Sequence, residues 1–142
     1  KEKTEIPSSA AVLPTAVLEL ARQGNEREVL AWLAQGGQVD ACCAEYQNAT
    51  LLMGAAARGR TPLVRLLLRR KASVGWQMDE GVTALMLASG AGQTATVQVL
   101  LDAGADASLR NNACDTALQF AEHCKQHATA SLLRRHAAKP RP

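Results

Sequence analysis

Aromatic residues are scarce in this chain: Phe, Trp and Tyr make up only 3% of its 142 residues, although 47% of the residues are hydrophobic. A core with so few rings has to be built from Ala, Leu and Val. Such residues are typical of closely packed helices, because Ala has the highest intrinsic helix propensity. The composition therefore predicts a soluble, mainly helical protein, and the length suits one domain.

Features of membrane and secreted proteins are also missing. No apolar run approaches the roughly 18 residues of a membrane-spanning helix, and residues 1–14 contain no signal-peptide segment. The sequence starts at Lys1 and not at Met. We interpret the chain as a piece of a longer protein, although a choice made in cloning would explain the missing Met equally well. The cysteines have no repeated spacing, so they do not predict a disulfide framework. We therefore expect an intracellular protein, cytoplasmic or nuclear, without membrane insertion.

Patterns that carry catalysis or bind cofactors are absent as well. Gly90-Ala91-Gly92 lacks the Lys and Ser/Thr of a phosphate-binding loop. His123, Cys124 and His127 lie close together, but zinc needs about four ligands in paired clusters, and the sequence has no second cluster. Nothing marks a third orienting group for a Cys–His nucleophile. We predict no enzymatic activity, no metal site and no cofactor.

What the sequence does contain is an internal repeat of 33 residues. Thr50, Thr83 and Thr116 stand at this interval, and each opens a similar apolar stretch. Thr15 opens a weaker copy 35 residues before Thr50. Glycines follow nine residues after the first three of these four threonines, at Gly24, Gly59 and Gly92. Agreement at several offsets indicates true repetition, which is typical of a stacked repeat protein.

The pattern within each repeat predicts two short helices. The threonine hydroxyl can accept a hydrogen bond from a free N–H of the first helical turn. Gly92 can end the first helix in left-handed geometry, and Val97, Leu100 and Leu101 form the apolar stripe of the second. One such pair is too small to bury its apolar face, so neighbouring pairs must stack.

The pattern resembles the ankyrin repeat, whose motif is Thr-Pro-Leu-His-x-Ala, and residues 100–107 (LLDAGADA) are close to the family's Leu-Leu-x-x-Gly-Ala-Asp-Val. The resemblance implies an all-α solenoid of four helix-turn-helix repeats joined by hairpin fingers. The expected segments are an N-terminal extension (1–13), a repeat domain (14–136) with repeats at about 14–47, 48–80, 81–113 and 114–136, and a basic tail (137–142).

The sequence departs from the family motif at several places. No proline follows the four threonines, and the motif's His is replaced by Leu18, Met53, Met86 and Gln119. We expect these replacements to remove polar links within the repeats. In the fourth repeat, residues 123–125 take the place of the glycine turn between the helices.

Hairpin fingers are expected at about residues 40–49 (finger 1), 75–82 (finger 2) and 108–115 (finger 3). The turn before each threonine requires a left-handed residue, which Gly81 suits and Asn48 tolerates. Cys114 in the third such position is unexpected, so finger 3 is expected to be strained or differently shaped.

The resemblance implies that a partner protein binds the concave surface formed by the fingers and first helices. We therefore predict an adaptor or scaffold module. The fingers are acidic, so the expected partner is a protein or peptide with basic character. The acidic residues in or beside the fingers are Asp40, Glu45, Asp79, Glu80, Asp106 and Asp115, against one base, Arg110.

Several residues are candidates for partner contact. Trp76 and Tyr46 are of the types that dominate binding energy at interfaces, although Trp76 can also fold back onto the neighbouring finger. Met53 and Met86 can line an adaptable groove, or can simply fill the core. The predicted partner-binding residues are Tyr46, Met53, Trp76, Met78, Asp79, Glu80, Met86 and Arg110.

Two other functions stay open. The second helix of repeat two and its flanks carry bases without acids, and these suit an anionic surface or a nucleic acid. These bases, named here the basic face, are Arg60, Arg65, Arg69, Arg70 and Lys71. The net charge of +3 is too small by itself to indicate nucleic-acid binding. The chain can also be a self-associating segment of a longer solenoid, and the sequence leaves its oligomeric state open.

Overall fold

The computed structural model describes residues 12–138, so most of the expected extension and the last four residues of the tail lie outside the described residues. Within residues 12–138 the helices form four successive pairs. The pairs are α2 (Thr15–Gln23) with α3 (Glu26–Ala34), α4 (Leu51–Ala57) with α5 (Thr61–Arg69), α6 (Ala84–Gly90) with α7 (Thr94–Asp102), and α8 (Ala117–His123) with α9 (His127–Ala138). The predicted all-α repeat solenoid is confirmed. Helix α9 continues past residue 136, where the last repeat was expected to end.

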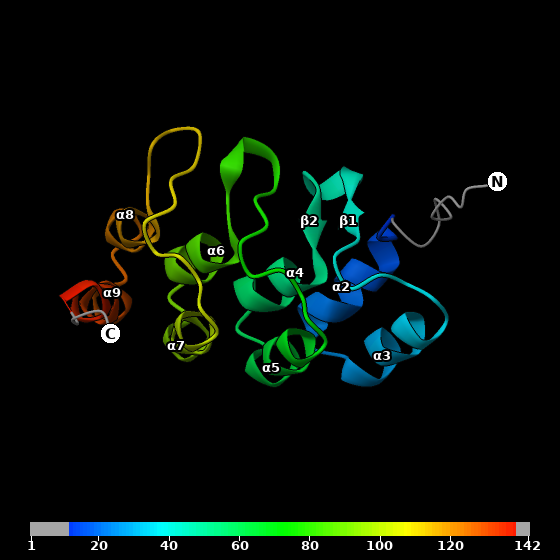
Figure 1. Cartoon of the computed structure of the whole chain (residues 1–142). Coiled ribbons are helices and arrows are strands. Elements are labelled where there is room, and N and C mark those ends of the chain that lie inside the picture. The colour runs from blue at the N-terminus through cyan, green and yellow to red at the C-terminus, as the bar shows by residue number, and fades with distance from the viewer. Residues whose placement is uncertain (1–11, 139–142) are drawn as a thin grey trace.

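The helix pairs lie side by side in an elongated array with two layers (Figure 1). The first helices of the pairs form the layer next to the fingers, and the second helices form the layer on the far side (Figure 1). Helix α4 packs against both α2 and α6, and α6 packs in turn against α8. Each repeat therefore buries its apolar face chiefly against its neighbours.

The first helices begin as the threonine pattern predicts. Thr50, Thr83 and Thr116 each precede a helix, and each hydroxyl accepts a hydrogen bond from the backbone N–H three residues later, at 3.2–3.4 Å. The first repeat differs, because Pro14 stands at the N-cap of α2 and Thr15 is its first helical residue. The capping prediction is thus confirmed for the three strong repeats.

Every helix-to-helix turn contains one left-handed residue. Gly24, Gly59 and Gly92 have φ values of 81°, 70° and 74°. In the fourth repeat Lys125 takes this position with a φ of 60°. The missing glycine therefore leaves the geometry of the turn unchanged, and Lys125 bears a local conformational cost.

Finger 1 is the one part of residues 12–138 with paired strands. Its strands β1 (Cys42–Cys43) and β2 (Ala49–Thr50) are antiparallel, with Cys42 opposite Thr50, and the 3-10 turn η1 (Ala44–Tyr46) joins them. The N–H of Leu13 also donates to the Cys42 carbonyl at 3.0 Å. Finger 1 is longer than the others, so its arms are long enough to pair.

The predicted left-handed turn residues in the fingers are confirmed. Asn48, Gly81 and Cys114 have φ values of 66°, 79° and 69°. In fingers 1 and 2 the preceding residue, Gln47 or Glu80, is also left-handed, and Glu80 lies in the turn η2 (Asp79–Gly81). Finger 3 has only one left-handed residue, Cys114, so its shape differs from that of the other two fingers.

Within two repeats, the expected loss of polar links is wrong. The Gln119 side-chain oxygen accepts a hydrogen bond from the Thr116 N–H at 2.8 Å. The sulfur of Met86 accepts one from the Thr83 N–H at 3.4 Å. Because these side chains reach back to the N-cap, they close the first helical turn as a capping box does.

Threonine pairs provide polar links between the second helices. The Thr61 and Thr96 hydroxyls lie 2.9 Å apart and join α5 to α7. The Thr94 and Thr129 hydroxyls lie 2.8 Å apart and join α7 to α9. Thr96 and Thr129 are buried, so each pair satisfies a hydroxyl that would otherwise be unpaired in the core.

Candidate functional site

The predicted partner-binding residues do not form a single surface. Tyr46, Met53 and Met78 line one hollow, whereas Trp76, Met86 and Arg110 have other places in the fold. Tyr46 is 38% exposed, and Met53 and Met86 are each only 1% exposed. Of the others, Trp76 and Met78 are half-buried, and Asp79, Glu80 and Arg110 are exposed.

Trp76 lies in finger 2 but packs toward finger 1. Its indole N–H donates to the backbone carbonyl of Asn48 at 3.2 Å, and its ring is half-buried against the core. A tryptophan held in this way joins the two fingers. The structure therefore favours the alternative interpretation, in which Trp76 folds back onto its neighbour.

Met86 and Arg110 also form hydrogen bonds within their own repeats. Met86 is buried and its sulfur accepts the Thr83 N–H, so it fills the core instead of lining a groove. The Arg110 guanidinium donates to the carbonyl of Cys114 at 2.9 Å within finger 3. Neither side chain contributes to the hollow.

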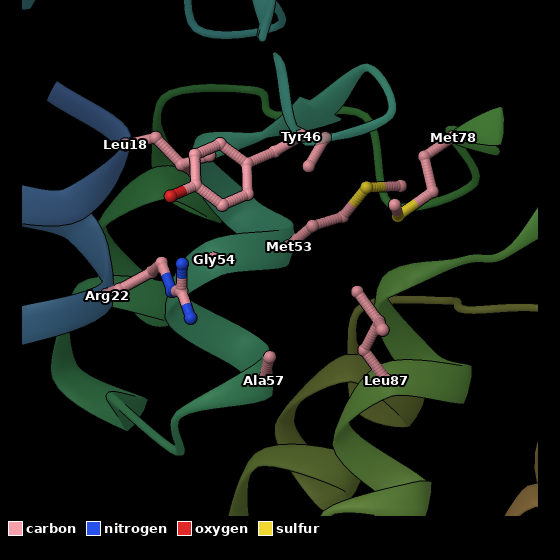
Figure 2. Close-up of a pocket in the computed structure, with 9 residues that line it drawn as sticks. Leu18, Arg22, Tyr46, Met53, Gly54, Ala57, Met78 and Leu87 are labelled. Carbon is pink, nitrogen blue, oxygen red and sulfur yellow. The ribbon is translucent and has the colours of Figure 1, made fainter. Parts of the chain in front are cut away.

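The hollow lies on the finger side of the second repeat, between α2, α4 and α6, and we name it the repeat-two hollow. Its volume is about 210 Å³. Figure 2 shows Leu18 and Arg22 on one side, Met53 and Ala57 along α4, and Met78 and Leu87 opposite. The lining is largely apolar and consists of Leu18, Arg22, Tyr46, Ala49, Met53, Gly54, Ala57, Met78 and Leu87.

Two small residues of α4 create this hollow. Gly54 stands where the third and fourth repeats have Leu87 and Phe120, and Ala57 is the other small residue on this face. An added Cβ at Gly54 would lie 2.8 Å from the Leu18 methyl carbon Cδ1, so a glycine also allows α2 to approach α4 closely. The sequence signal was available for Gly54, because alignment of the repeats places this glycine at the position of Leu87 and Phe120.

The next repeat has a comparable small residue, but its space is occupied. Gly90 is the counterpart of Ala57. A Cβ at Gly90 would lie in contact with the Phe120 ring at 3.5 Å and with the Cys124 sulfur at 3.7 Å. The large residue of the fourth repeat thus covers this position, which explains why the hollow forms at repeat two.

Arg22 forms a charged part of the wall. Its guanidinium carbon lies 5.4 Å from the centre of the Tyr46 ring, a cation–π distance. A guanidinium nitrogen also lies 2.9 Å from a Glu19 carboxylate oxygen. The charge of Arg22 is therefore balanced by a neighbour on its own helix, and its guanidinium lies over the Tyr46 ring beside the hollow.

The fingers above the hollow are tied to one another. The Asp79 N–H donates to the Gln47 carbonyl at 2.8 Å, and the Asn48 amide donates to the Asp79 carboxylate at 2.9 Å. One repeat further on, the Asn112 N–H donates to the Glu80 carbonyl at 2.8 Å. These bonds fix the fingers as a continuous row beside the groove.

Acidic side chains flank the hollow on the finger side. Glu45 directly precedes Tyr46, and Asp79 and Glu80 directly follow Met78. All three acids are exposed. The Glu45 carboxylate accepts a hydrogen bond from the Thr15 hydroxyl. Negative charge therefore stands next to lining residues on both fingers.

The basic face lies on the opposite side of the same repeat, along and around α5 in the far layer (Figure 1). All five of its cations are exposed. Arg60 donates a hydrogen bond to the Arg22 carbonyl at 2.9 Å. Among residues 12–138, the ion pairs found, Arg22–Glu19 and Arg134–Glu122, do not include these cations.

Other candidate chemistry is limited within the part of the chain that the structure describes. There, no three His, Cys, Asp or Glu residues lie together as a metal site. The four cysteines are unpaired, with Cys43 buried and Cys114 and Cys124 exposed. None of the helices in this part has the length and apolar character needed to cross a membrane.

Comparison with known proteins gives the repeats a family. The family model for ankyrin repeats, which contains three copies of the repeat, matches residues 17–111 and again residues 52–141. The chain belongs to the ankyrin repeat family. A comparison with curated proteins found no match.

Ankyrin repeats are in general protein–protein interaction modules, and the family is typically non-enzymatic. The family has no fixed partner chemistry, because function lies in particular surface residues of the array. In this ankyrin array, the repeat-two hollow lies where Gly54 stands at the position of Leu87 and Phe120 of the following repeats.

Proposed function

We propose that this ankyrin repeat protein is an adaptor or scaffold module that binds a partner protein or peptide in the groove between its fingers and first helices. The observation that supports this most is the repeat-two hollow, an apolar space of about 210 Å³ beside a row of tied fingers. A concave, mostly apolar site with a few polar groups at its edge is typical of binding sites.

Charge supports the same surface. The exposed acids Glu45, Asp79 and Glu80 stand beside the hollow. An acidic rim attracts a basic partner and accelerates its approach, and this effect weakens as salt is added. We therefore propose that the partner has basic character.

Filling the hollow tests this function. Ala57→Leu adds bulk at a half-buried position that lines the hollow, while Ala95→Leu adds the same side chain at an exposed position of α7. The wild type and both variants are used to capture proteins from a lysate of the cells that express this protein. We expect Ala57→Leu to lose partners that the other two retain, with affinities reduced about ten-fold or more.

The same capture experiment tests a second candidate, binding of an anionic partner by the basic face. Its five cations are exposed and lack ion pairs among residues 12–138. This candidate predicts partners that are indifferent to Ala57→Leu and that a moderate increase in salt removes. Recovery of identical proteins by all three baits, with no effect of salt, would contradict both candidates.

We also propose an intracellular location, cytoplasmic or nuclear. Unpaired cysteines, including the exposed Cys114 and Cys124, support a reducing compartment. Imaging of the fluorescently tagged full-length protein tests this, and its recovery from the culture medium would contradict it.

A further inference from the structure

We propose that the repeat-two hollow takes one aromatic side chain from a flexible segment of the partner, and that a Lys or Arg beside that residue pairs with the acidic finger tips. This inference rests on the proposed function and specifies the chemistry of the partner. It follows from the size of the hollow, the atoms in its wall and the charges at its edge.

The size of the hollow matches a single ring. An apolar cavity of about 150 Å³ in a protein core holds benzene. The repeat-two hollow, at about 210 Å³, has room for a ring of that size, although it opens to the surface. Because the hollow is open to the surface, a partner residue can reach it without any movement of the helices.

The wall favours a ring over an aliphatic side chain. Met53 and Met78 come from α4 and finger 2, and Figure 2 shows the ends of these two side chains pointing toward one another. Sulfur atoms make favourable contacts with aromatic rings at about 5 Å. Arg22 already lies against one ring, that of Tyr46, and a guanidinium can hold a second ring on its other side. An aliphatic side chain would fill the space but would gain neither contact.

The floor suits a flat group. Gly54 has no side chain and is buried, and the half-buried Ala57 has a single methyl, so no large side chain of α4 projects into the hollow there. Met53 is almost fully buried and contributes only its edge to this floor. Leu18 and Leu87 stand on either side, so a ring laid on α4 is bounded by apolar groups (Figure 2).

The charges indicate what stands beside the ring. The cation of Arg22 is balanced by Glu19 at 2.9 Å, so the hollow itself has no need of a carboxylate. The finger edge, by contrast, carries Glu45, Asp79 and Glu80 close to the lining residues Tyr46 and Met78. Within residues 12–138 no cation forms an ion pair with these three acids. A partner Lys or Arg next to the aromatic residue supplies the missing opposite charge.

Selection from a random peptide library gives a direct test. The library is displayed on phage and selected on the full-length wild-type protein. We expect enriched peptides to share one Phe, Tyr or Trp with Lys or Arg next to it. In the best peptide, changing the aromatic residue to Ala should weaken binding about 30-fold, and changing it to Leu should weaken binding about five-fold.

The three methionines provide a reporter on the position of the ring. In protein labelled with ¹³C at the methionine methyl groups, Met53 and Met78 report on the hollow, while the buried Met86 outside it is an internal control. Addition of the selected peptide should move the Met53 and Met78 methyl signals upfield through the ring current and leave Met86 in place. The Leu version of the peptide should produce no such upfield shift.

Paired variants separate the two parts of the proposal. Ala57→Leu should reduce peptide affinity about 30-fold, whereas Ala95→Leu should leave it unchanged. Glu80→Gln should reduce the affinity several-fold and flatten its salt dependence, while Glu28→Gln, the same charge change on the far layer, should not. Circular dichroism and the unchanged Met86 signal establish that each variant is folded.

The outcomes distinguish this inference from the proposed function. Two outcomes overturn the inference and still leave the groove as a binding site. In the first, the peptides lose affinity for Ala57→Leu but share no aromatic residue. In the second, they shift neither the Met53 nor the Met78 methyl signal upfield. An enriched aromatic residue without a neighbouring base overturns the charge component. If no peptide is enriched, the inference is overturned, and the proposed function is then decided by the lysate capture with Ala57→Leu and Ala95→Leu.

Discussion

Single residues determine where this repeat array has a hollow. Equivalent positions of successive repeats carry Gly54, Leu87 and Phe120, and the hollow forms at the glycine. The backbone of these repeats is nearly the same, so the size of one side chain per repeat decides whether the groove is open or filled. An aligned array thus acquires a specific site without any change of fold.

A left-handed backbone conformation at a residue other than glycine lowers the stability of the fold, and a substitution by glycine can remove this conformational strain. Cys114 is exposed and has a φ of 69°, a region that costs a residue with a Cβ about 1 kcal/mol or more. Cys114→Gly should therefore raise the free energy of unfolding by about 0.5–1 kcal/mol, as measured by urea denaturation. Cys114→Ala, which keeps the Cβ, should have little effect. A loss of stability in Cys114→Gly would contradict the assignment of strain.

At the scale of the helix, polar groups connect neighbouring repeats. The Thr61–Thr96 pair joins α5 to α7, and the Thr94–Thr129 pair joins α7 to α9. Arg60 also donates to the carbonyl of Arg22 in the preceding repeat, and Gln126 donates to that of Gly90. Helices α7 and α9 are thus each bonded to the preceding second helix, and the residues before α5 and α9 are bonded to the first helix of the preceding repeat.

A double-mutant cycle measures one of these links. The Thr94 and Thr129 hydroxyls bond to each other, and Thr129 is fully buried. Either single variant, Thr94→Val or Thr129→Val, leaves the other hydroxyl without this partner. Each should lower the free energy of unfolding by about 1–2 kcal/mol. The double variant should cost clearly less than the sum, with a coupling of about 1 kcal/mol. Additive costs in urea denaturation would mean that the two hydroxyls do not stabilise each other.

At the scale of the whole molecule, burial is greatest in the middle of the array. In α4 six of the seven residues are buried, and in α6 five of seven. In α8 two are buried, and in α3 one. Because each repeat is stabilised chiefly by its neighbours, the central helices have support on both sides.

Amide hydrogen exchange should follow this gradient. We expect the amides of α4 and α6 to exchange most slowly and those of α3 and the last turn of α9 to exchange fastest, because opening at the ends disrupts fewer contacts. Hydrogen–deuterium exchange followed by mass spectrometry measures this directly. Equal protection in every helix would indicate a single cooperative unit and would contradict the expected gradient.

Much of the fold could be predicted, because it depends on local pattern. The interval between Thr50, Thr83 and Thr116 predicted the helix starts, since an N-cap acts within one turn. The left-handed residues two positions before Thr50, Thr83 and Thr116 were also predicted, since they depend on the turn alone, whereas left-handed Gln47 and Glu80 were not predicted. The strands of finger 1 were not predicted, because pairing depends on how two arms meet in space.

The candidate site was predicted only in part. Tyr46, Met53 and Met78 were singled out and do line the hollow. Trp76 and Met86 were singled out as well, but Trp76 bonds to finger 1 and Met86 closes its own helix. Residue type alone does not distinguish a binding side chain from a packed one, because both are large and apolar.

The sequence by itself determined the repeat, the helix pairs and the acidic character of the fingers, because each of these follows from residues close together in the chain. Only the tertiary structure decided where the repeat-two hollow, the proposed binding site, lies. The repeat-two hollow requires Leu18 and Arg22 from α2, Gly54 from α4 and Leu87 from α6 to stand around one space. That arrangement arises from stacking of three repeats, so it depends on distances between residues that are far apart in the chain.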